Sequence, residues 1–235
     1  MFKGLSVGAL VLVLSACGAP RQRPGSPPSR QPSVSGAAAP ALGRIYKIDE
    51  NRSELRILVY RAGPLARFGH NHVIINRAIR GSVSLADSTE ASVVSLIVPA
   101  AGFVVDDAQA RMQEGPDFAA DVPEDAKSGT LRNMLSAALL DADEFPVITV
   151  NSVAVSGGQD SAGGLTASVA ISITGHEAKI DVPFKLQSDS QHLSAKGTLD
   201  LRQSVLGLTP YSLMLGALQV QDAMTIKFDI TAIPG

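Results

Sequence analysis

Cysteine, tryptophan and other aromatic residues are scarce in this chain of 235 residues. A single cysteine, Cys17, excludes an intramolecular disulfide. With no tryptophan, three tyrosines and seven phenylalanines, the chain lacks the aromatic platforms on which single-stranded nucleic acids stack. It also lacks a nucleophile elbow, a phosphate-binding loop, a zincin helix and a paired-cysteine motif. We therefore predict a protein that is not an enzyme, binds no nucleic acid and needs neither a cofactor nor a metal.

Long apolar runs are also missing, apart from a short one near the amino terminus. Residues 5–14 follow Lys3 and are too few to cross a bilayer as a helix, which is typical of a signal peptide. The run ends in Leu14-Ser15-Ala16-Cys17, which resembles the bacterial lipoprotein box, in which the cysteine becomes the first residue and is lipidated with acyl chains such as palmitate. We therefore predict a lipoprotein signal peptide over residues 1–16 and lipidation of Cys17. The alternative is an ordinary signal peptide followed by a chance cysteine.

Residues 17–41 have no apolar periodicity and are rich in Pro, Gly, Ser and Ala, so we predict a disordered tether. This tether carries three arginines and no acid, whereas residues 42–235 hold 16 Lys and Arg (20 less Lys3 and those three) against all 22 acids. The remaining 194 residues suit one domain of acidic charge. Because Gly18 rather than Asp follows the cysteine, enteric-type sorting favours the outer membrane. We expect an anchored protein of the bacterial cell envelope that faces the periplasm.

The clearest secondary-structure pattern lies in residues 165–186. Apolar and polar residues alternate from Leu165 to Thr174 and again from Ala178 to Leu186, which predicts two half-buried strands. A two-residue loop at Gly175-His176, of type II′, would pair Ile171 with Ile180 and place all apolar residues on one face. Pro183 removes one hydrogen-bond donor and predicts an unpaired edge or a bulge beside it.

Similar alternation elsewhere predicts about eight or nine antiparallel strands and one main helical insertion. The insertion contains a capping box at residues 121–124 and a second candidate cap, Thr130, for a helix ending at Leu140. Its apolar stripe is expected to pack in the core rather than hold a cofactor. Asp106-Asp107 and the acids of residues 114–124 are predicted to form a solvated loop. This number of strands suits a closed barrel or a sandwich.

Five stretches of the chain, in order, resemble motifs of the YceI-like family of bacterial exported proteins. The chain departs from the family pattern at Arg52, where a histidine is usual, at Val205-Leu206, and at residues 68–72. The similar stretches are Tyr46-Lys47-Ile48-Asp49 with Ser53, residues 140–150, the hairpin of residues 173–180, Leu201 to Leu208 with Gly207, and Val220 to Met224.

This resemblance implies an all-β fold, a lipocalin-like antiparallel barrel of about eight strands with an elongated apolar interior. It also implies that the interior holds a lipid of polyisoprenoid type. On the inward parity of the predicted strands, we expect the ligand to contact Val169, Ile171, Ile180, Val182, Phe184, Met224, Ile226 and Phe228.

His70 and His72 are the most specific candidates for polar chemistry, because alternate residues of a strand project to the same face. Three roles remain open for them: a shared metal, a contact to the head group of a ligand, or a structural or solvated pair. A regular strand from Phe68 would place both histidines opposite Val73, Ile75 and Val83, which predicts exposure to solvent. Replacing both by alanine would then cost about 1 kcal/mol or less.

Three functions follow from these observations. The first is a membrane-anchored protein that binds a long isoprenoid or similar apolar lipid inside its barrel. The second is a metal- or redox-assisted periplasmic enzyme centred on His70 and His72. The third is a structural lipoprotein whose barrel is fully packed and binds only protein. Room for an acyl chain in the interior would favour the first over the third. The oligomeric state is left open.

Overall fold

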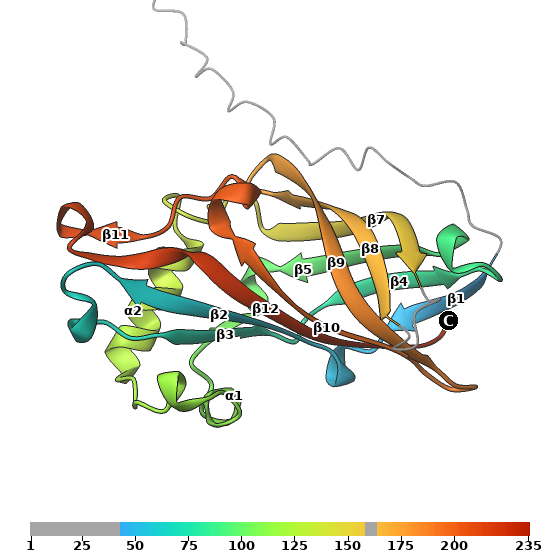
Figure 1. The fold of residues 1–235 in the computed structure, drawn as a ribbon, viewed down its shortest axis with the longest axis horizontal. Helices are drawn as coiled ribbons and strands as arrows, with labels where there is room; N and C mark the ends of the chain where they lie inside the picture. Colours follow the sequence, from blue (N-terminus) through green and yellow to red (C-terminus); the bar gives the residue numbers. More distant parts are fainter. Residues whose placement is uncertain (1–42, 158–163) are drawn as a thin grey trace, which may run out of the picture. The chain divides into compact units, whose positions relative to one another are not determined.

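The computed structural model describes residues 43–157 and 164–235. The signal peptide predicted over residues 1–16, the lipidated Cys17 and the tether over residues 17–41 lie outside the described residues. The described part is mostly β-sheet with two short α-helices (Figure 1). The elements are β1 (Arg44–Ile48), β2 (Glu54–Ala62), β3 (His72–Asn76), β4 (Arg80–Leu85), β5 (Val93–Pro99), β6 (Phe103–Val105), α1 (Ala108–Met112), α2 (Glu124–Leu135), β7 (Val147–Gly157), β8 (Gly164–Ile173), β9 (His176–Ser188), β10 (Leu193–Arg202), β11 (Ser212–Leu213) and β12 (Leu218–Pro234).

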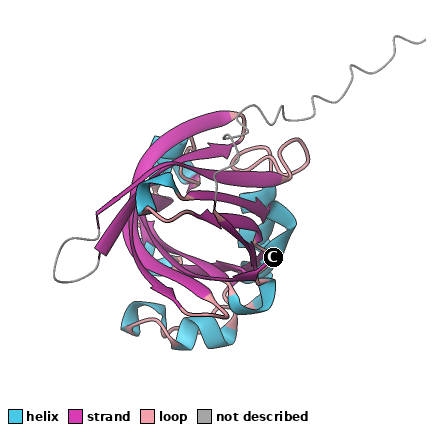
Figure 2. Ribbon diagram, turned by 90° about the vertical axis from the view of Figure 1, so that its right-hand side faces the viewer, coloured by secondary structure: helices cyan, strands magenta, loops and turns pink. Residues whose placement is uncertain are grey.

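Eight of the strands close into an antiparallel barrel, which confirms the predicted fold class. Their order is β1-β4-β5-β7-β8-β9-β10-β12, and pairing of Ile48 in β1 with Ala232 in β12 closes the ring. Figure 2 looks into this ring of strands. Closure gives each of these strands a neighbour on both sides, and it separates an inner face from an outer face.

A flap of three further strands extends the sheet beyond β12. The long strand β12 pairs with β2 as far as Asp229 and with β1 from Ala232 onward. On its other side β2 pairs with β3, and β3 pairs with β6. At the corner between β1 and β2, the buried Ser53 side chain bonds both backbone groups of Thr231. Helix α2 packs against β6 and places Met134 in the core. The flap and α2 therefore continue the barrel wall at one end.

The β8–β9 hairpin confirms the predicted inward face but not the predicted turn. Ile173 pairs with His176 and Val169 with Ile180, so the two-residue loop is Thr174-Gly175 rather than Gly175-His176. Both loop residues have positive φ, 47° and 74°, as in a type I′ turn, whose twist matches the flanking strands. The turn lies one residue earlier than predicted, which shifts the pairing of the two strands by two residues, so that Ile171 pairs with Ala178 instead of Ile180. A shift by an even number leaves each side chain on its predicted face.

The edge predicted at Pro183 is present. Pairing of β9 with β10 covers only four residue pairs and ends at Lys185 with Lys196. From Pro183 back to the turn, β9 is paired with β8 alone. Gly197 opposite this point is required by close packing, because a Cβ there would lie 2.4 Å from both the Phe228 ring and the Pro183 carbonyl oxygen.

The single face predicted for Val73, Ile75 and Val83 is wrong. Val83 belongs to the core inside the barrel, whereas Val73 and Ile75 lie on its outer side, in a second cluster with Ala110 and Phe118. The segment of residues 106–120, including α1, covers that part of the wall. The alternation does not carry over from β3 to β4, because the chain turns after the buried residue Asn76. The Asn76 side chain holds this turn by accepting a hydrogen bond from the Ala78 amide.

The helical insertion also differs from its prediction. Helix α2 begins at Glu124, the last residue of the predicted capping box, but its N-cap is Pro123 and no side chain caps it, so the box does not form. The helix ends at Leu135, so Thr130 lies inside it and does not cap it. Acids in its first turn suit the positive end of the helix dipole. No helix in residues 43–157 or 164–235 is long and apolar enough to cross a membrane.

Candidate functional site

The barrel encloses a cavity of about 670 Å³, within the range of small-molecule sites. Its walls are the inward side chains of the barrel strands, the flap and α2, and most of them are aliphatic. The interior has space because most of the side chains that face one another across it are small or branched, and only a few, such as Phe103, Phe184 and Phe228, are aromatic. The barrel is therefore not fully packed, as the third hypothesis would require, and has room for a ligand.

All eight residues predicted to contact the ligand line this one cavity. The four strands β8, β9, β10 and β12 alternate regularly, so their inward parity is set by the closed barrel. The eight are Val169, Ile171, Ile180, Val182, Phe184, Met224, Ile226 and Phe228.

One end of the cavity is polar. At this end β2 and β10 finish and β12 begins. Arg61, near the end of β2, pairs with Val220 of β12, and Arg202, the last residue of β10, pairs with Ala223 of β12. Phe68 and Leu213 line the cavity and are also exposed, so the cavity reaches the surface at this end. The polar side chains of the lining are Arg61, His70, His72, Thr130, Asn133, Gln203, Tyr211 and Gln219.

His70 and His72 lie at this polar end, and their predicted exposure to bulk solvent is wrong. They do project to the face opposite Val73 and Ile75, but that face is the interior of the barrel. The His72 side chain is only 13% exposed, and the two imidazole centroids are 6.1 Å apart. The parity argument failed because the segment of residues 106–120 buries the outer face of β3, so both faces of the strand are covered.

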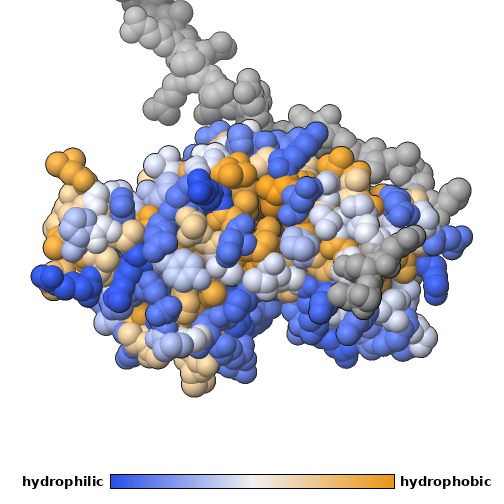
Figure 3. Space-filling model, viewed as in Figure 1, coloured by the Kyte–Doolittle hydropathy of each residue, from blue (hydrophilic) through white to orange (hydrophobic). Residues whose placement is uncertain are grey.

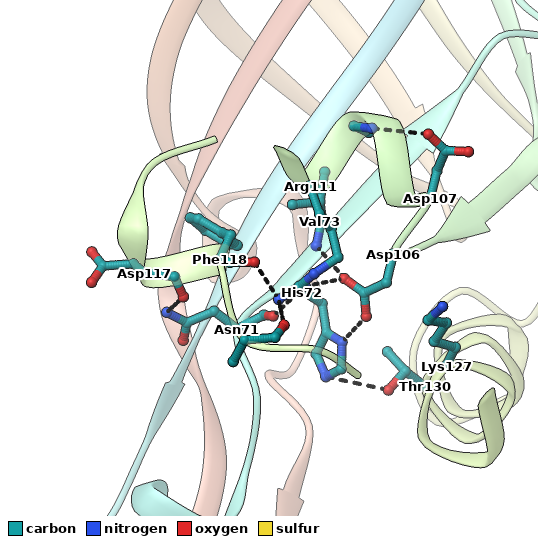
Figure 4. A network of polar contacts seen from close by, with 12 residues as sticks. Asn71, His72, Val73, Asp106, Asp107, Arg111, Asp117, Phe118, Lys127 and Thr130 are labelled. Carbon is teal, nitrogen blue, oxygen red and sulfur yellow. Dashed lines mark hydrogen bonds and ion pairs between the residues drawn. The ribbon is translucent and has the colours of Figure 1, made fainter. Parts of the chain in front are cut away.

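His72 is held by a buried carboxylate, Asp106 (Figure 4). Asp106 is 1% exposed, and its Oδ2 lies 2.5 Å from His72 Nδ1. Its Oδ1 accepts hydrogen bonds from the Val73 amide, at 2.9 Å, and from Arg111 Nη1, at 2.5 Å. An ionised carboxylate only accepts hydrogen bonds, so Nδ1 of His72 carries the proton and Nε2 faces Thr130 Oγ1, at 3.4 Å. The imidazole is thereby fixed in one orientation at the cavity wall.

His72, the Val73 amide and Arg111 together keep Asp106 ionised. Burial alone raises the pKa of the Asp106 carboxyl, but its hydrogen bond to His72, the charge of that imidazole, the Val73 amide and Arg111 together hold the pKa below its ordinary value. The remaining donors of Arg111 bond the carbonyl oxygens of Asn71, Phe118 and Ala120. One guanidinium therefore fixes both the carboxylate and the covering segment.

The role of Asp106 is not visible in the sequence. The pair Asp106-Asp107 was expected in a solvated loop, and of the two that expectation is right only for Asp107, which caps α1 through the Ala110 amide. It is also wrong for Glu114, whose buried carboxylate pairs with Arg56 and Lys227. Asp106 has φ of 56° and turns back against β3. Arg111 five residues later is the one local signal, because a loop can bring an acid and a base at that spacing together.

A metal centre on the two histidines would need a third ligand. Nδ1 of His72 is bonded to Asp106, and its Nε2 has Thr130 as a neighbour. Among the residues that the structure describes, no group of three or more His, Cys, Asp or Glu side chains is placed to hold a metal ion. The arrangement presents an imidazole edge, a hydroxyl and amides to the cavity, which suits hydrogen bonding to a polar group.

Comparison with known proteins agrees with this geometry. A model of the YceI-like domain matches residues 46–232. A search of curated proteins finds no match. The solved structure of BcnA from Burkholderia cenocepacia is similar, with a TM-score of 0.58, 13% identity, and coverage of 78% of this chain and 98% of that chain. A polyisoprenoid binding domain from Saccharophagus degradans, implicated in plant cell wall breakdown, is similar with a TM-score of 0.53, 13% identity, and coverage of 81% and 98%. At these identities the two structures show the shared fold.

Proposed function

This chain belongs to the YceI-like family, and from that premise we propose that it is a binding protein that holds a long apolar lipid of polyisoprenoid type inside its barrel. The observation that carries the proposal is the cavity itself, which is aliphatic along its length and polar at one end. A hydrocarbon chain with a polar head group has the same distribution of polarity.

Burial of apolar surface supplies the affinity. Each Å² of apolar surface removed from water is worth about 25 cal/mol, so a few hundred Å² give several kcal/mol before ordering costs. The similar domain of Saccharophagus degradans, described as polyisoprenoid binding, supports a ligand of this kind. A slender branched chain suits walls made of branched side chains such as Val169, Ile171 and Ile180.

The polar end gives the ligand its orientation. We place a head group beside His70 and His72, where Thr130 and Asn133 also line the cavity. Asp106 fixes the orientation of His72 in advance, so little ordering is needed when a ligand binds.

Membrane attachment through lipidated Cys17 belongs to the proposal and rests on the sequence alone. The lipoprotein box, the flexible composition of residues 18–41 and Gly18 support a protein anchored at the outer membrane, facing the periplasm. An anchored binding protein would meet its lipid at the membrane surface.

The test is uptake of a radiolabelled polyprenol from vesicles, compared between two variants of β9. Ile180→Asp places a charge on the cavity wall, whereas Gln187→Asp adds the same charge at an exposed position of the same strand. An unpaired carboxylate in an apolar cavity is costly, so uptake should fall at least about tenfold in the first variant and stay unchanged in the second. Equal uptake by both variants, with both folded by circular dichroism, would place the ligand outside the barrel.

A metal- or redox-assisted enzyme is less well supported, because no third His, Cys, Asp or Glu side chain among the described residues is placed to share a metal with His70 and His72. Metal analysis of the protein after refolding with zinc, copper or iron measures this directly. Stoichiometric metal that is lost in His70→Ala would favour the enzyme.

A further inference from the structure

Two loops at the polar end of the cavity lie side by side and reach into solvent. One contains the short helix η2 (Ala66–Phe68), and the other contains η7 (Met214–Gly216), which follows β11. The Leu65 amide donates a hydrogen bond to the Ala217 carbonyl oxygen, at 2.8 Å, and joins them. We call residues 65–69 and 213–217 the tip loops.

The tip loops expose large apolar side chains. Phe68 is 64% exposed, Met214 is 76% exposed and Leu215 is fully exposed. In the space-filling view, apolar surface projects at the end of the barrel where Figure 1 labels β11 (Figure 3). Large apolar side chains exposed together on two adjoining loops are typical of a surface that meets an apolar partner.

The backbone holds two of these side chains outward at a cost. Met214 and Leu215 have φ of 51° and 55°, in the left-handed region that residues other than glycine rarely adopt. In that region the Cβ of an L-residue lies too close to the following carbonyl oxygen, so each of the two residues is strained. Asn or Gly at these positions would relieve the strain, so stability does not explain the residues present. Strain of this kind is retained mainly where function requires it.

Charge identifies the partner as a lipid surface. Residues 61–75 and 201–221 contain no Asp or Glu, although the domain as a whole is acidic. They contain Arg61, Arg67 and Arg202, and the Arg67 guanidinium lies 4.6 Å from the centroid of the Phe68 ring. An arginine beside exposed apolar side chains matches the interface of a bilayer, where anionic head groups overlie acyl chains.

We propose that the tip loops dock on a lipid bilayer. Met214, Leu215 and Phe68 enter the acyl region, and Arg67 lies at the level of the phosphates. Phe68 and Leu213 also line the cavity, so a docked tip joins the bilayer interior to the barrel interior. A lipid then passes between them without exposing its chain to water. The docking itself does not depend on the proposed function, but the transfer of a lipid through it does.

The absence of tryptophan from the chain makes a direct test of insertion available. In the full-length lipidated protein, Leu215→Trp introduces a single fluorophore at the tip. Val153→Trp introduces one in β7, where Val153 is 60% exposed and neither neighbouring strand, β5 nor β8, belongs to the tip loops. Both proteins are reconstituted on vesicles of phosphatidylcholine and phosphatidylglycerol whose acyl chains carry bromine, which quenches tryptophan on contact.

Docking predicts a blue-shifted emission for Leu215→Trp and quenching severalfold stronger than for Val153→Trp. Equal quenching of the two would overturn the proposal. The double variant Met214→Asn with Leu215→Asn removes the apolar side chains of the tip. Asn suits the left-handed backbone, and both positions lie outside the cavity lining, so stability should be kept. Its uptake of polyprenol should fall severalfold. Uptake without quenching at Leu215→Trp overturns the docking alone. Quenching without uptake by the wild-type chain supports the docking and overturns the proposed ligand.

Discussion

Asp106 is the residue on which the polar end of the cavity depends. It is buried, charged and bonded to His72, Val73 and Arg111. A buried charge of this kind contributes little when replaced together with its partners, but removing one partner leaves the others uncompensated. The two histidines should therefore differ, although the sequence presents them as a pair.

We predict that His72→Ala lowers the free energy of unfolding by about 2 to 3 kcal/mol, because Asp106 loses a hydrogen bond in a buried site. His70→Ala should cost less than about 1 kcal/mol, as usual for a partly exposed side chain outside such a network. Urea denaturation of the two single variants measures the difference. Equal losses would mean that the imidazole of His72 is not held by Asp106.

Acid should remove the contribution of Asp106. Its pKa is lower in the folded chain than the ordinary value of 3.8, so its contribution is complete above that value and is lost as pH falls through the folded pKa. We predict that the free energies of unfolding of the wild type and of Asp106→Asn converge as pH falls below that ordinary value and through the folded pKa. A difference that stays constant over this range would show that the pKa of Asp106 is not lowered by folding.

At the scale of elements, the β8–β9 hairpin carries a local conflict between sequence and turn. Thr174 is β-branched and has φ of 47°, a conformation in which Asn is far better tolerated. We predict that Thr174→Asn stabilises the domain by about 0.5 to 1 kcal/mol, seen as a higher urea midpoint with an unchanged slope.

The matched change at the other turn position should act in the opposite direction. Gly175 has φ of 74°, and a Cβ there would lie 3.4 Å from the Phe145 ring. Gly175→Ala should therefore destabilise the domain by about 1 kcal/mol. If Thr174→Asn also destabilised, the turn would not be of type I′.

Two stretches that resemble family motifs meet in the structure. Ser204 bonds the Asp222 carboxylate through both its amide, at 2.8 Å, and its hydroxyl, at 2.6 Å. Gly207 ends the short helix η6 (Gln203–Leu206) with φ of 75°, and a Cβ there would lie 2.9 Å from the His176 ring. These contacts therefore fasten the end of β10 to β12 and β9, and the same two stretches also supply Gln203 and Met224 to the cavity wall.

Period-two alternation in β8, β9, β10 and β12 was sufficient to predict the inward face, because a closed barrel gives every strand one apolar side. It failed for β3, where residues 106–120 cover the outer face and leave Val73 as buried as Ile74. Alternation cannot identify the inner face of a strand buried on both sides. The Asp106 network was missed for a related reason, since its members come from β3, a loop and α1 and meet only in the tertiary structure.

At the scale of the whole molecule, a ligand that binds only the folded barrel must stabilise it. We predict that saturation with polyprenol raises the unfolding temperature, by the equivalent of about 2.7 kcal/mol at a hundred times the dissociation constant. Ile180→Asp should abolish this increase, and Gln187→Asp should retain it. A shift of the same size in both variants would indicate nonspecific protection by lipid.

The proposed anchor is separate from the barrel. We predict that Cys17→Ser releases the protein from membranes while its domain stays folded, because several acyl chains bind a bilayer far more firmly than three arginines do. Fractionation at high salt measures this. Sedimentation of Cys17→Ser with membranes under those conditions would contradict the anchor.

The most direct test of the central claim is lipid extraction of the native protein, purified without added lipid, followed by mass spectrometry. A cavity this size and this apolar should retain its ligand through purification, so we predict one long apolar lipid per chain. The same lipid should be absent from Ile180→Asp purified in parallel. A native protein that yields no lipid and takes up none from vesicles would contradict the account.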